Sequence, residues 1–272
     1  MPSGFPRLMN AAITATADHT LDTRASGFSA LRRTPALERP LAVAVVGLLD
    51  GSWPERLYDA HDSCHGGPRA GARSESFEFF PRVRRRVRRP TMVDLCAGHG
   101  LVGLIFALCE PSVTRVELVD ARQPASFERI WTAFTAIAPW VAEKVSYREA
   151  ALDESLRLPT EAGVVLAHAC GGLTDLGLDC AIASGGLVAA MPCCYGTARG
   201  PRMPALSKSF GRSANIDITR SCRLADAGYQ VDWTHIPQAI TTMNRVLAGW
   251  DRQPPRPSPA GGVGSQDPHP VD

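Results

Sequence analysis

The stretch TMVDLCAGHGLVG, from Thr91 to Gly103, holds the residues whose types and spacing most clearly predict chemistry. An apolar run leads into Asp94, and a glycine-rich turn containing Gly98 and Gly100 precedes a helix-forming segment. Glycines let backbone N–H groups approach a ligand closely, and a helix N-terminus adds unpaired donors and a positive dipole end. The glycines satisfy the G-x-G-x-x-G pattern, so a dinucleotide is one candidate ligand.

Two carboxylates indicate which of the candidate ligands fits the turn. Asp94 lies at the end of the predicted strand, where it would repel a pyrophosphate but attract an ammonium group, directly or through one water. Asp120 ends the next predicted strand, 22 residues after Gly98, and a carboxylate there can hold both hydroxyls of a ribose. A ligand with an ammonium group, a ribose and an adenine but no phosphate is S-adenosylmethionine. A nicotinamide cofactor, or a glycine turn with no ligand, stays open as an alternative.

Strand and helix patterns alternate along the middle of the chain. Apolar runs predict strands over residues 91–95, 114–119, 144–149, 163–168 and 185–191, and helical patterns lie at 101–109, 125–137 and 173–183. A helix over 218–227 ends at Gly228, which suits a left-handed cap, and runs at 229–233 and 245–250 predict a closing hairpin. This rhythm predicts an α/β fold with a mostly parallel sheet, whose strand ends gather ligand-binding residues at one edge.

The chain resembles the class I S-adenosylmethionine-dependent methyltransferases over about residues 90–250. Their motif I, Asp/Glu-x-x-x-Gly-x-Gly, is matched from Asp94 to Gly100, and their acidic residue after the second strand is matched by Asp120. The resemblance implies a Rossmann-like seven-stranded sheet with an antiparallel closing hairpin, and S-adenosylmethionine as cofactor. The residues it assigns to cofactor binding are Asp94, Cys96, Ala97, Gly98, Gly100, Asp120, Ala121 and Ala150.

Two more segments follow the fourth and fifth predicted strands, where the methyl acceptor is expected. One reads His-x-Cys-Gly-x-x-Thr-Asp from His168 to Asp175, and the other is Pro192-Cys193-Cys194. They resemble the group that includes eukaryotic tRNA 2′-O-methyltransferases of the acceptor stem, although this chain lacks the zinc-binding N-terminal region of those enzymes. The Asn/Asp-Pro-Pro-Tyr/Phe motif of adenine and glutamine methyltransferases is absent. RNA is the expected acceptor, with a small molecule or a protein side chain as alternatives.

The residues assigned to catalysis on the acceptor side are His168, Cys170, Asp175, Cys193 and Cys194. His168 or Asp175 would act on a 2′-hydroxyl as a base or by orienting it. The plainer interpretations are that His168 lines the cleft through its backbone, and that Thr174 and Asp175 cap a helix starting near Leu176. The Cys193–Cys194 pair has three interpretations: packing, contact with substrate, or a metal site with Cys170. We assign no metal site from the sequence.

The segment Pro81–Pro90 carries six arginines, and removing them would change the formal net charge from +2 to −4. Arginine clusters bind phosphate backbones, so the segment is a candidate nucleic-acid contact. A solvated helix or extended connector is the plainer interpretation. Asn244 and Arg245, beside the last loop, are candidate substrate contacts or simply part of a strand connection.

Composition and hydropathy bound the class of protein. Hydrophobic residues make up 44% and charged residues 21%, as is usual for a globular protein. The longest apolar run, Leu41 to Leu49, is far shorter than the roughly 20 residues of a membrane-spanning helix. The N-terminus shows no signal-peptide pattern, and the eight cysteines form no pair of CxxC motifs, so we expect a cytoplasmic protein with reduced thiols.

The expected organisation has four parts: a disordered arm over 1–35, a helical N-terminal extension with the basic connector over 36–89, the methyltransferase domain over 90–250, and a disordered tail over 251–272. His61, Cys64 and His65 lie close together in the extension but lack a second ligand cluster, so they are not assigned as a metal site. A methyltransferase-like module that holds RNA without turnover is the alternative from a different functional class.

Overall fold

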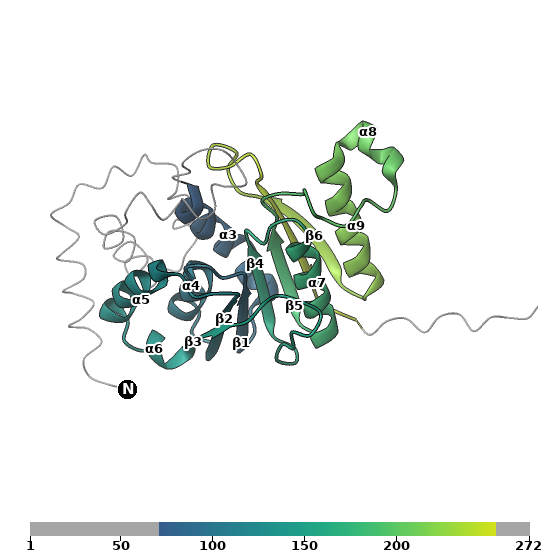
Figure 1. Ribbon diagram of the computed structural model, residues 1–272. Helices are drawn as coiled ribbons and strands as arrows, with labels where there is room; N and C mark the ends of the chain where they lie inside the picture. The colour runs from purple at the N-terminus through teal and green to yellow at the C-terminus, as the bar shows by residue number, and fades with distance from the viewer. Residues whose placement is uncertain (1–70, 254–272) are drawn as a thin grey trace, which may run out of the picture.

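The computed structural model describes residues 71–253 (Figure 1). The expected N-terminal arm, most of the helical extension, the loop with His61, Cys64 and His65, and the tail beyond Gln253 lie outside the described residues. Among the helices of the described region, none has the length and apolar character needed to cross a membrane.

One sheet of seven strands forms the centre of the structure, in the order β3-β2-β1-β4-β5-β7-β6. The strands are β1 (Thr91–Leu95), β2 (Arg115–Asp120), β3 (Val145–Glu149), β4 (Gly163–Ala167), β5 (Leu187–Met191), β6 (Gln230–His235) and β7 (Arg245–Trp250). β7 runs antiparallel to both of its neighbours, and the remaining pairings are parallel. This arrangement confirms the predicted α/β fold with its closing antiparallel hairpin.

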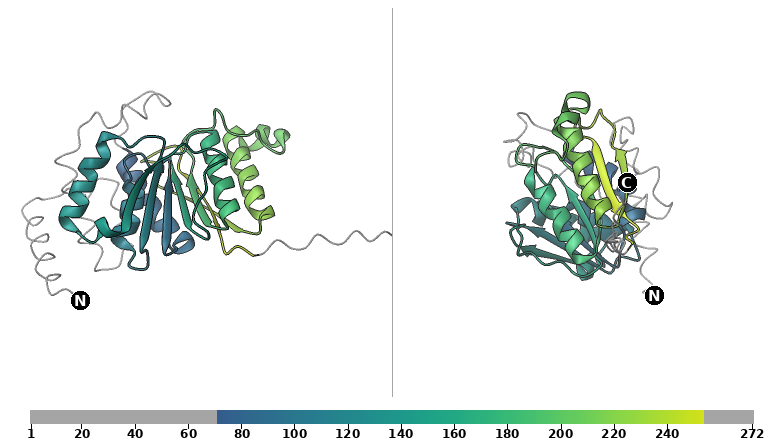
Figure 2. Two further views of the ribbon diagram at one scale, coloured as in Figure 1. Left: turned by 60° about the horizontal axis from the view of Figure 1, so that its bottom comes forward. Right: turned by 90° about the vertical axis from the view of Figure 1, so that its right-hand side faces the viewer.

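Helices cover both faces of the sheet (Figure 2). The described helices are α3 (Gly71–Val87), α4 (Leu101–Cys109), α5 (Ala125–Ile137), α6 (Val141–Lys144), α7 (Gly172–Ser184), η5 (Pro204–Leu206), α8 (Ser207–Phe210) and α9 (Arg212–Asp226), of which η5 and α8 pack beside α9 rather than on the sheet. From the central pair β1 and β4, the chain proceeds outwards in opposite directions. Because such crossovers are right-handed, α4 and α7 cover opposite faces. Gly228 has the expected left-handed φ, +92°, after α9.

Helix α3 is part of this fold rather than a separate extension. It continues through Pro81 into the arginine-rich segment and contacts α4, β4, β5 and β7. Its side chains Phe79, Val83 and Val87 are fully buried against the sheet and α4. The boundary predicted at residue 89 therefore divides a helix from the sheet on which it packs.

The arginine-rich segment is largely neutralised within the fold. Four of its six arginines form ion pairs: Arg82 with Glu78, Arg84 and Arg88 with Glu110, and Arg86 with Asp232. The helical interpretation is confirmed as far as Val87, where α3 ends. The four paired arginines do not form a continuous basic surface for nucleic acid. Arg85 and Arg89 are exposed.

Gly163 tests the close packing of α3 on β4. A Cβ at this position would lie 2.1 Å from the Val87 carbonyl oxygen and 2.4 Å from the Met92 sulfur. We expect Gly163→Ala to lower the free energy of unfolding by about 2–3 kcal/mol, because backbone must move to admit the methyl group. Gly200→Ala is the control, since no atom lies within 4 Å of its added Cβ. Urea unfolding that gives equal stabilities for the two variants would contradict this packing.

Candidate functional site

The glycine-rich turn after β1 is fastened to the two strands beside it. The Gly98 N–H donates a hydrogen bond to Asp120 Oδ2 at 2.8 Å, and the Tyr147 hydroxyl donates to the Gly98 carbonyl at 2.8 Å. The Ala97 N–H donates to the Val119 carbonyl at 3.1 Å. The turn is thus held at the carboxyl edge of β1, β2 and β3, where a parallel sheet binds its ligands.

The glycines of this turn have two different structural roles. A Cβ on Gly100 or Gly103 would lie 2.6 Å or 2.3 Å from a methyl group of Leu118, so both positions let α4 pack closely on β2. Gly98 has φ +52°, and a Cβ added there would meet nothing within 4 Å. The turn therefore presents open space at Gly98, where its backbone can be approached.

Cys96 occupies a strained position in the same turn. Its φ is +56°, in the left-handed region that L-residues adopt at a cost of about 1 kcal/mol. Burial raises the pKa of the thiol to about 12, with further contributions from the charges of Asp120 and Asp94. This thiol stays protonated at neutral pH, and the strain it causes lies in the turn that the sequence assigns to the cofactor.

Asp94 is a buried carboxyl group beside the turn. Its Oδ2 accepts a hydrogen bond from the Gly103 N–H at 2.9 Å. Burial raises its pKa to about 7; the Gly103 hydrogen bond and His168 oppose this effect, and Asp120 adds to it. Two carboxyl groups therefore influence each other at this edge, and among the described residues no lysine or arginine forms an ion pair with either. An ammonium group would interact favourably with these carboxyl groups, whereas a pyrophosphate would be repelled.

The other residues assigned to the cofactor lie along the same edge. Ala97 is in the turn after β1, Ala121 directly follows β2, and Ala150 directly follows β3. The Ala150 N–H donates to the Asp120 carbonyl at 2.8 Å, so the ends of β2 and β3 are joined. The structure thus gathers the eight residues of the predicted cofactor site, which come from β1, β2 and the segments that follow β1, β2 and β3.

His168 lies at the end of β4 with a left-handed φ of +68°. Its backbone N–H donates to the Met191 carbonyl at 3.2 Å, and its Nε2 lies 3.0 Å from Glu75 Oε2. Glu75 belongs to α3 and is 4% exposed. A carboxylate in this place can orient the imidazole ring. Sequence reasoning missed Glu75, because it assigns residues 36–89 to an extension outside the methyltransferase domain.

Three thiols meet where the loops after β4 and β5 come together. The sulfur atoms of Cys170, Cys193 and Cys194 all lie within 4.8 Å of one another, and those of Cys170 and Cys193 are 3.0 Å apart. Burial raises the pKa of Cys194, and its hydrogen bond with Cys170 adds to this. These surroundings do not activate Cys194 as a thiolate nucleophile.

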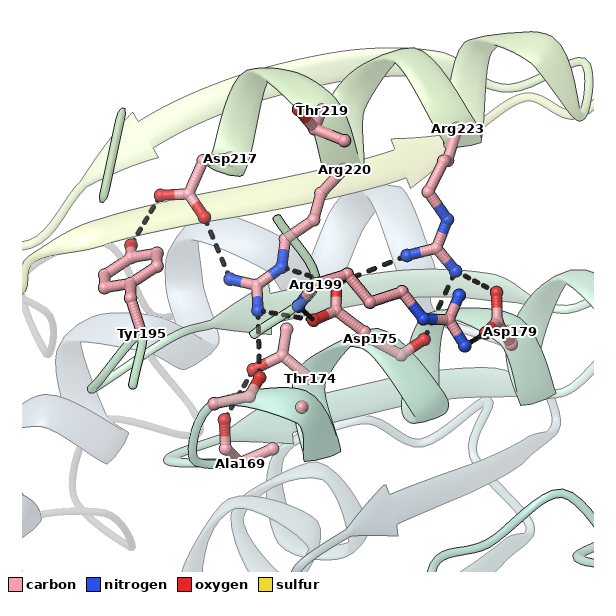
Figure 3. A network of polar contacts seen from close by, with 12 residues as sticks. Ala169, Thr174, Asp175, Asp179, Tyr195, Arg199, Asp217, Thr219, Arg220 and Arg223 are labelled. Atoms are coloured by element: carbon pink, nitrogen blue, oxygen red, sulfur yellow. Dashed lines mark hydrogen bonds and ion pairs between the residues drawn. The ribbon is translucent and has the colours of Figure 1, made fainter. Parts of the chain in front are cut away.

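Asp175 lies in a buried ionic network rather than in the acceptor site (Figure 3). Its carboxylate accepts hydrogen bonds from Arg220 Nε at 3.0 Å, Arg223 Nη1 at 3.2 Å and the Arg199 N–H at 3.0 Å. With these donors in place, we assign it no catalytic role. The predicted helix cap is also wrong, because α7 begins at Gly172 and has no side-chain cap.

Arg220 links this network to both loops of the acceptor side. It is 1% exposed and donates to Asp217 Oδ1 and the Gly171 carbonyl, each at 3.0 Å. Asp217 Oδ2 accepts from the Tyr195 hydroxyl at 2.5 Å and from Arg245 Nε at 2.9 Å. Gly171 follows β4 and Tyr195 follows β5, so α9 holds the two loops that carry the thiols.

The two residues expected to contact substrate near the last loop have structural partners. Arg245 pairs with Asp217, and Asn244 Nδ2 donates to the Ile236 carbonyl at 2.9 Å. The strand-connection interpretation therefore describes them better.

The chain was compared with known proteins in three ways. Searches of protein-family models and of curated proteins found no match. Among solved structures, an O-methyltransferase family protein from Burkholderia thailandensis is 16% identical, with 89% of this chain and 77% of that chain covered and a TM-score of 0.40. An rRNA methylase from Streptococcus thermophilus is 13% identical, covering 63% of this chain and 92% of that one with a TM-score of 0.39.

A third structure is the Pyrococcus abyssi tRNA (uracil-54, C5)-methyltransferase in complex with S-adenosyl-L-homocysteine. It is 10% identical, with 65% of this chain and 38% of that chain covered and a TM-score of 0.37. Likenesses this distant identify no substrate. The assignment of the fold depends on the order and directions of the seven strands themselves.

Arg220 gives a direct test of the buried network. We expect Arg220→Met to lower the free energy of unfolding by about 3–5 kcal/mol, because two buried carboxylates would lose their shared counter-charge. The control is Arg202→Met, whose ion pair with Asp226 has side chains 55% and 61% exposed and which should change stability by under about 1 kcal/mol. Equal losses for the two variants in urea unfolding would contradict the role given to Arg220.

Asp94 gives a test by pH. Its folded-state pKa of about 7 lies above the ordinary value of 3.8, so the folded state holds the proton more tightly. The stability of the protein should fall relative to Asp94→Asn as pH rises between these values, by up to about 1.4 kcal/mol per pH unit. Urea unfolding at pH 5, 6, 7 and 8 would measure the difference. A wild type more stable than Asp94→Asn at pH 8 would show that the buried charge is not a cost.

Proposed function

We propose that this chain is an S-adenosylmethionine-dependent methyltransferase. The observation that carries the proposal is the pair of carboxyl groups, Asp94 and Asp120, on either side of an open glycine turn at the carboxyl edge of the sheet. Such an edge disfavours a pyrophosphate and favours a ligand with an ammonium group and a ribose. When bound, this cofactor supplies an electrophilic methyl group on a sulfonium ion.

Each residue of the turn would have a distinct part in binding. Asp94, in its ionised form, would attract the ammonium group, and Asp120 would accept hydrogen bonds from the ribose hydroxyls. Ala121 and Ala150 would lie beside the adenine, since they follow the two strands on that side of β1. The methyl group would then point towards β4, the neighbour of β1 on the other side.

His168 is the residue at the end of β4 that is suited to prepare an acceptor. A hydroxyl group loses its proton as its oxygen takes the methyl group, and the imidazole of His168 would accept that proton. Glu75, whose Oε2 lies 3.0 Å from Nε2, would hold the imidazole ring in its orientation for this step. The pair thus provides a base whose partner comes from α3, a helix that precedes the sheet in the chain.

RNA is the acceptor that we propose. Its support is the resemblance of the segments at His168–Asp175 and Cys193–Cys194 to tRNA 2′-O-methyltransferases, together with the exposed Arg85 and Arg89. The four paired arginines of α3 and its C-terminal end add no such support. A small-molecule hydroxyl would suit the same His168–Glu75 pair and is the alternative acceptor.

The experiment is a transfer assay with S-adenosylmethionine labelled in its methyl group. The purified chain is incubated separately with total RNA, a metabolite extract and a protein extract, and label is measured in each. We expect label in RNA that ribonuclease releases. His168→Asn should lower the rate by about 10²- to 10³-fold and Glu75→Gln by about tenfold, with cofactor affinity unchanged.

His235→Asn serves as the matched control, since this histidine is exposed on β6 and should leave the rate unchanged. Label in the metabolite fraction would overturn RNA as the acceptor. Cofactor binding without transfer to any fraction would favour a non-catalytic module, and a full rate in His168→Asn would remove the proposed base.

A further inference from the structure

The three thiols at the ends of β4 and β5 form a cluster that methyl transfer does not explain. Cys170 comes from the loop after β4, and Cys193 and Cys194 from the loop after β5. Their sulfur atoms lie within 4.8 Å of one another, although the two loops are far apart in the sequence. Cys193 is buried, whereas Cys170 and Cys194 are partly accessible, so an ion could reach the cluster from solvent.

We propose that Cys170, Cys193 and Cys194 together bind one thiophilic metal ion of the zinc class. Sulfur ligands on a tetrahedral zinc ion, at about 2.3 Å from the metal, lie about 3.8 Å from one another. The shortest sulfur–sulfur distance here is 3.0 Å and all pairs are within 4.8 Å, so small side-chain rotations bring them to that spacing. Three soft sulfur ligands select such a metal over magnesium or calcium.

The loops are held in place before any metal arrives. The His168 N–H donates to the Met191 carbonyl at 3.2 Å, and the Gly171 N–H donates to the Cys194 carbonyl at 3.3 Å. Arg220 binds the Gly171 carbonyl from the other side. Three ligands that the fold already brings together lose little conformational entropy on binding, and this favours a specific site.

Metal binding would change the protonation of these three thiols, because the thiolate is the form of cysteine that ligates a metal. Each thiol that becomes a ligand would release its proton to the solvent.

Three protein ligands leave the fourth position of a tetrahedral ion for water or another small ligand, as in catalytic rather than structural zinc sites. The proposed site is next to His168, because the Cys193 sulfur lies 3.6 Å from the His168 carbonyl oxygen. The proposal does not depend on methyl transfer, and metal uptake can be measured without any cofactor.

The test is a titration of the reduced, chelator-treated protein with Co²⁺, followed by displacement with Zn²⁺. We expect one ion per chain, with the charge-transfer absorption of cobalt–thiolate bonds, and metal content by mass spectrometry should agree. Cys170→Ser should weaken binding by about 100-fold and lower the charge-transfer intensity. Cys222→Ser, a partly buried cysteine on α9, is the control and should bind as the wild type does.

Near- and far-ultraviolet circular dichroism would show whether Cys170→Ser is folded, and Cys194→Ser provides the second variant if it is not. A wild type that takes up no stoichiometric metal after reduction would overturn the proposal. So would cobalt binding without thiolate charge transfer, or equal affinities for the wild type and the folded serine variants.

Discussion

A buried guanidinium group organises the part of this protein where chemistry would occur. Arg220 has two carboxylates, Asp175 and Asp217, as partners and also binds the Gly171 carbonyl, all within 3.2 Å. Through Asp217 it is connected to Tyr195, and thus to the loop after β5. One residue of α9 therefore helps to set the relative position of the two loops, which also share a direct hydrogen bond from the Gly171 N–H to the Cys194 carbonyl. Arg223 and Arg245 each pair with one of these buried carboxylates, but Arg220 is the counter-charge that the two share.

Within the described part of the chain, the carboxyl groups beside the glycine turn are not paired with arginines in this way. There Asp94 and Asp120 lie at the same edge, and burial raises the pKa of Asp94, with the charge of Asp120 adding to this effect. The buried carboxylates beside the acceptor loops are thus paired with arginines, whereas those at the glycine turn form no ion pair with a described lysine or arginine. A buried carboxyl group with a raised pKa in a turn with open space is typical of a ligand site rather than of a structural ion pair. This contrast supports a cationic ligand more directly than the glycine pattern does.

The elements that were predicted correctly are those whose sequence signals lie in contiguous residues. β1, α4, α5 and β7 begin and end at the expected residues, since each is an apolar run or helical pattern bounded by turn residues. The cofactor residues were predicted for the same reason: the turn and the two acids are placed by their distance from strand ends. Short elements such as α6 and α8 carry too few residues to show a period.

What sequence reasoning missed depends on residues far apart in the chain. The arginine-rich segment resembled a nucleic-acid contact because Glu110 and Asp232, its partners, lie in other elements. Glu75 could not be paired with His168 without knowing that α3 packs against β4 and β5. Asp175 resembled a base or a cap because its arginines come from α9, 45 residues away in the case of Arg220. Local patterns reveal the turn, whereas tertiary packing decides which charged groups remain available to a ligand.

The central claim is that the glycine turn binds a ligand carrying an ammonium group and a ribose but no pyrophosphate. Isothermal titration of the purified protein with S-adenosylmethionine, S-adenosylhomocysteine and NAD, each separately, tests it most directly. The account predicts one-to-one binding of the two adenosyl ligands and none of NAD. Binding of NAD in preference to both adenosyl ligands would contradict it.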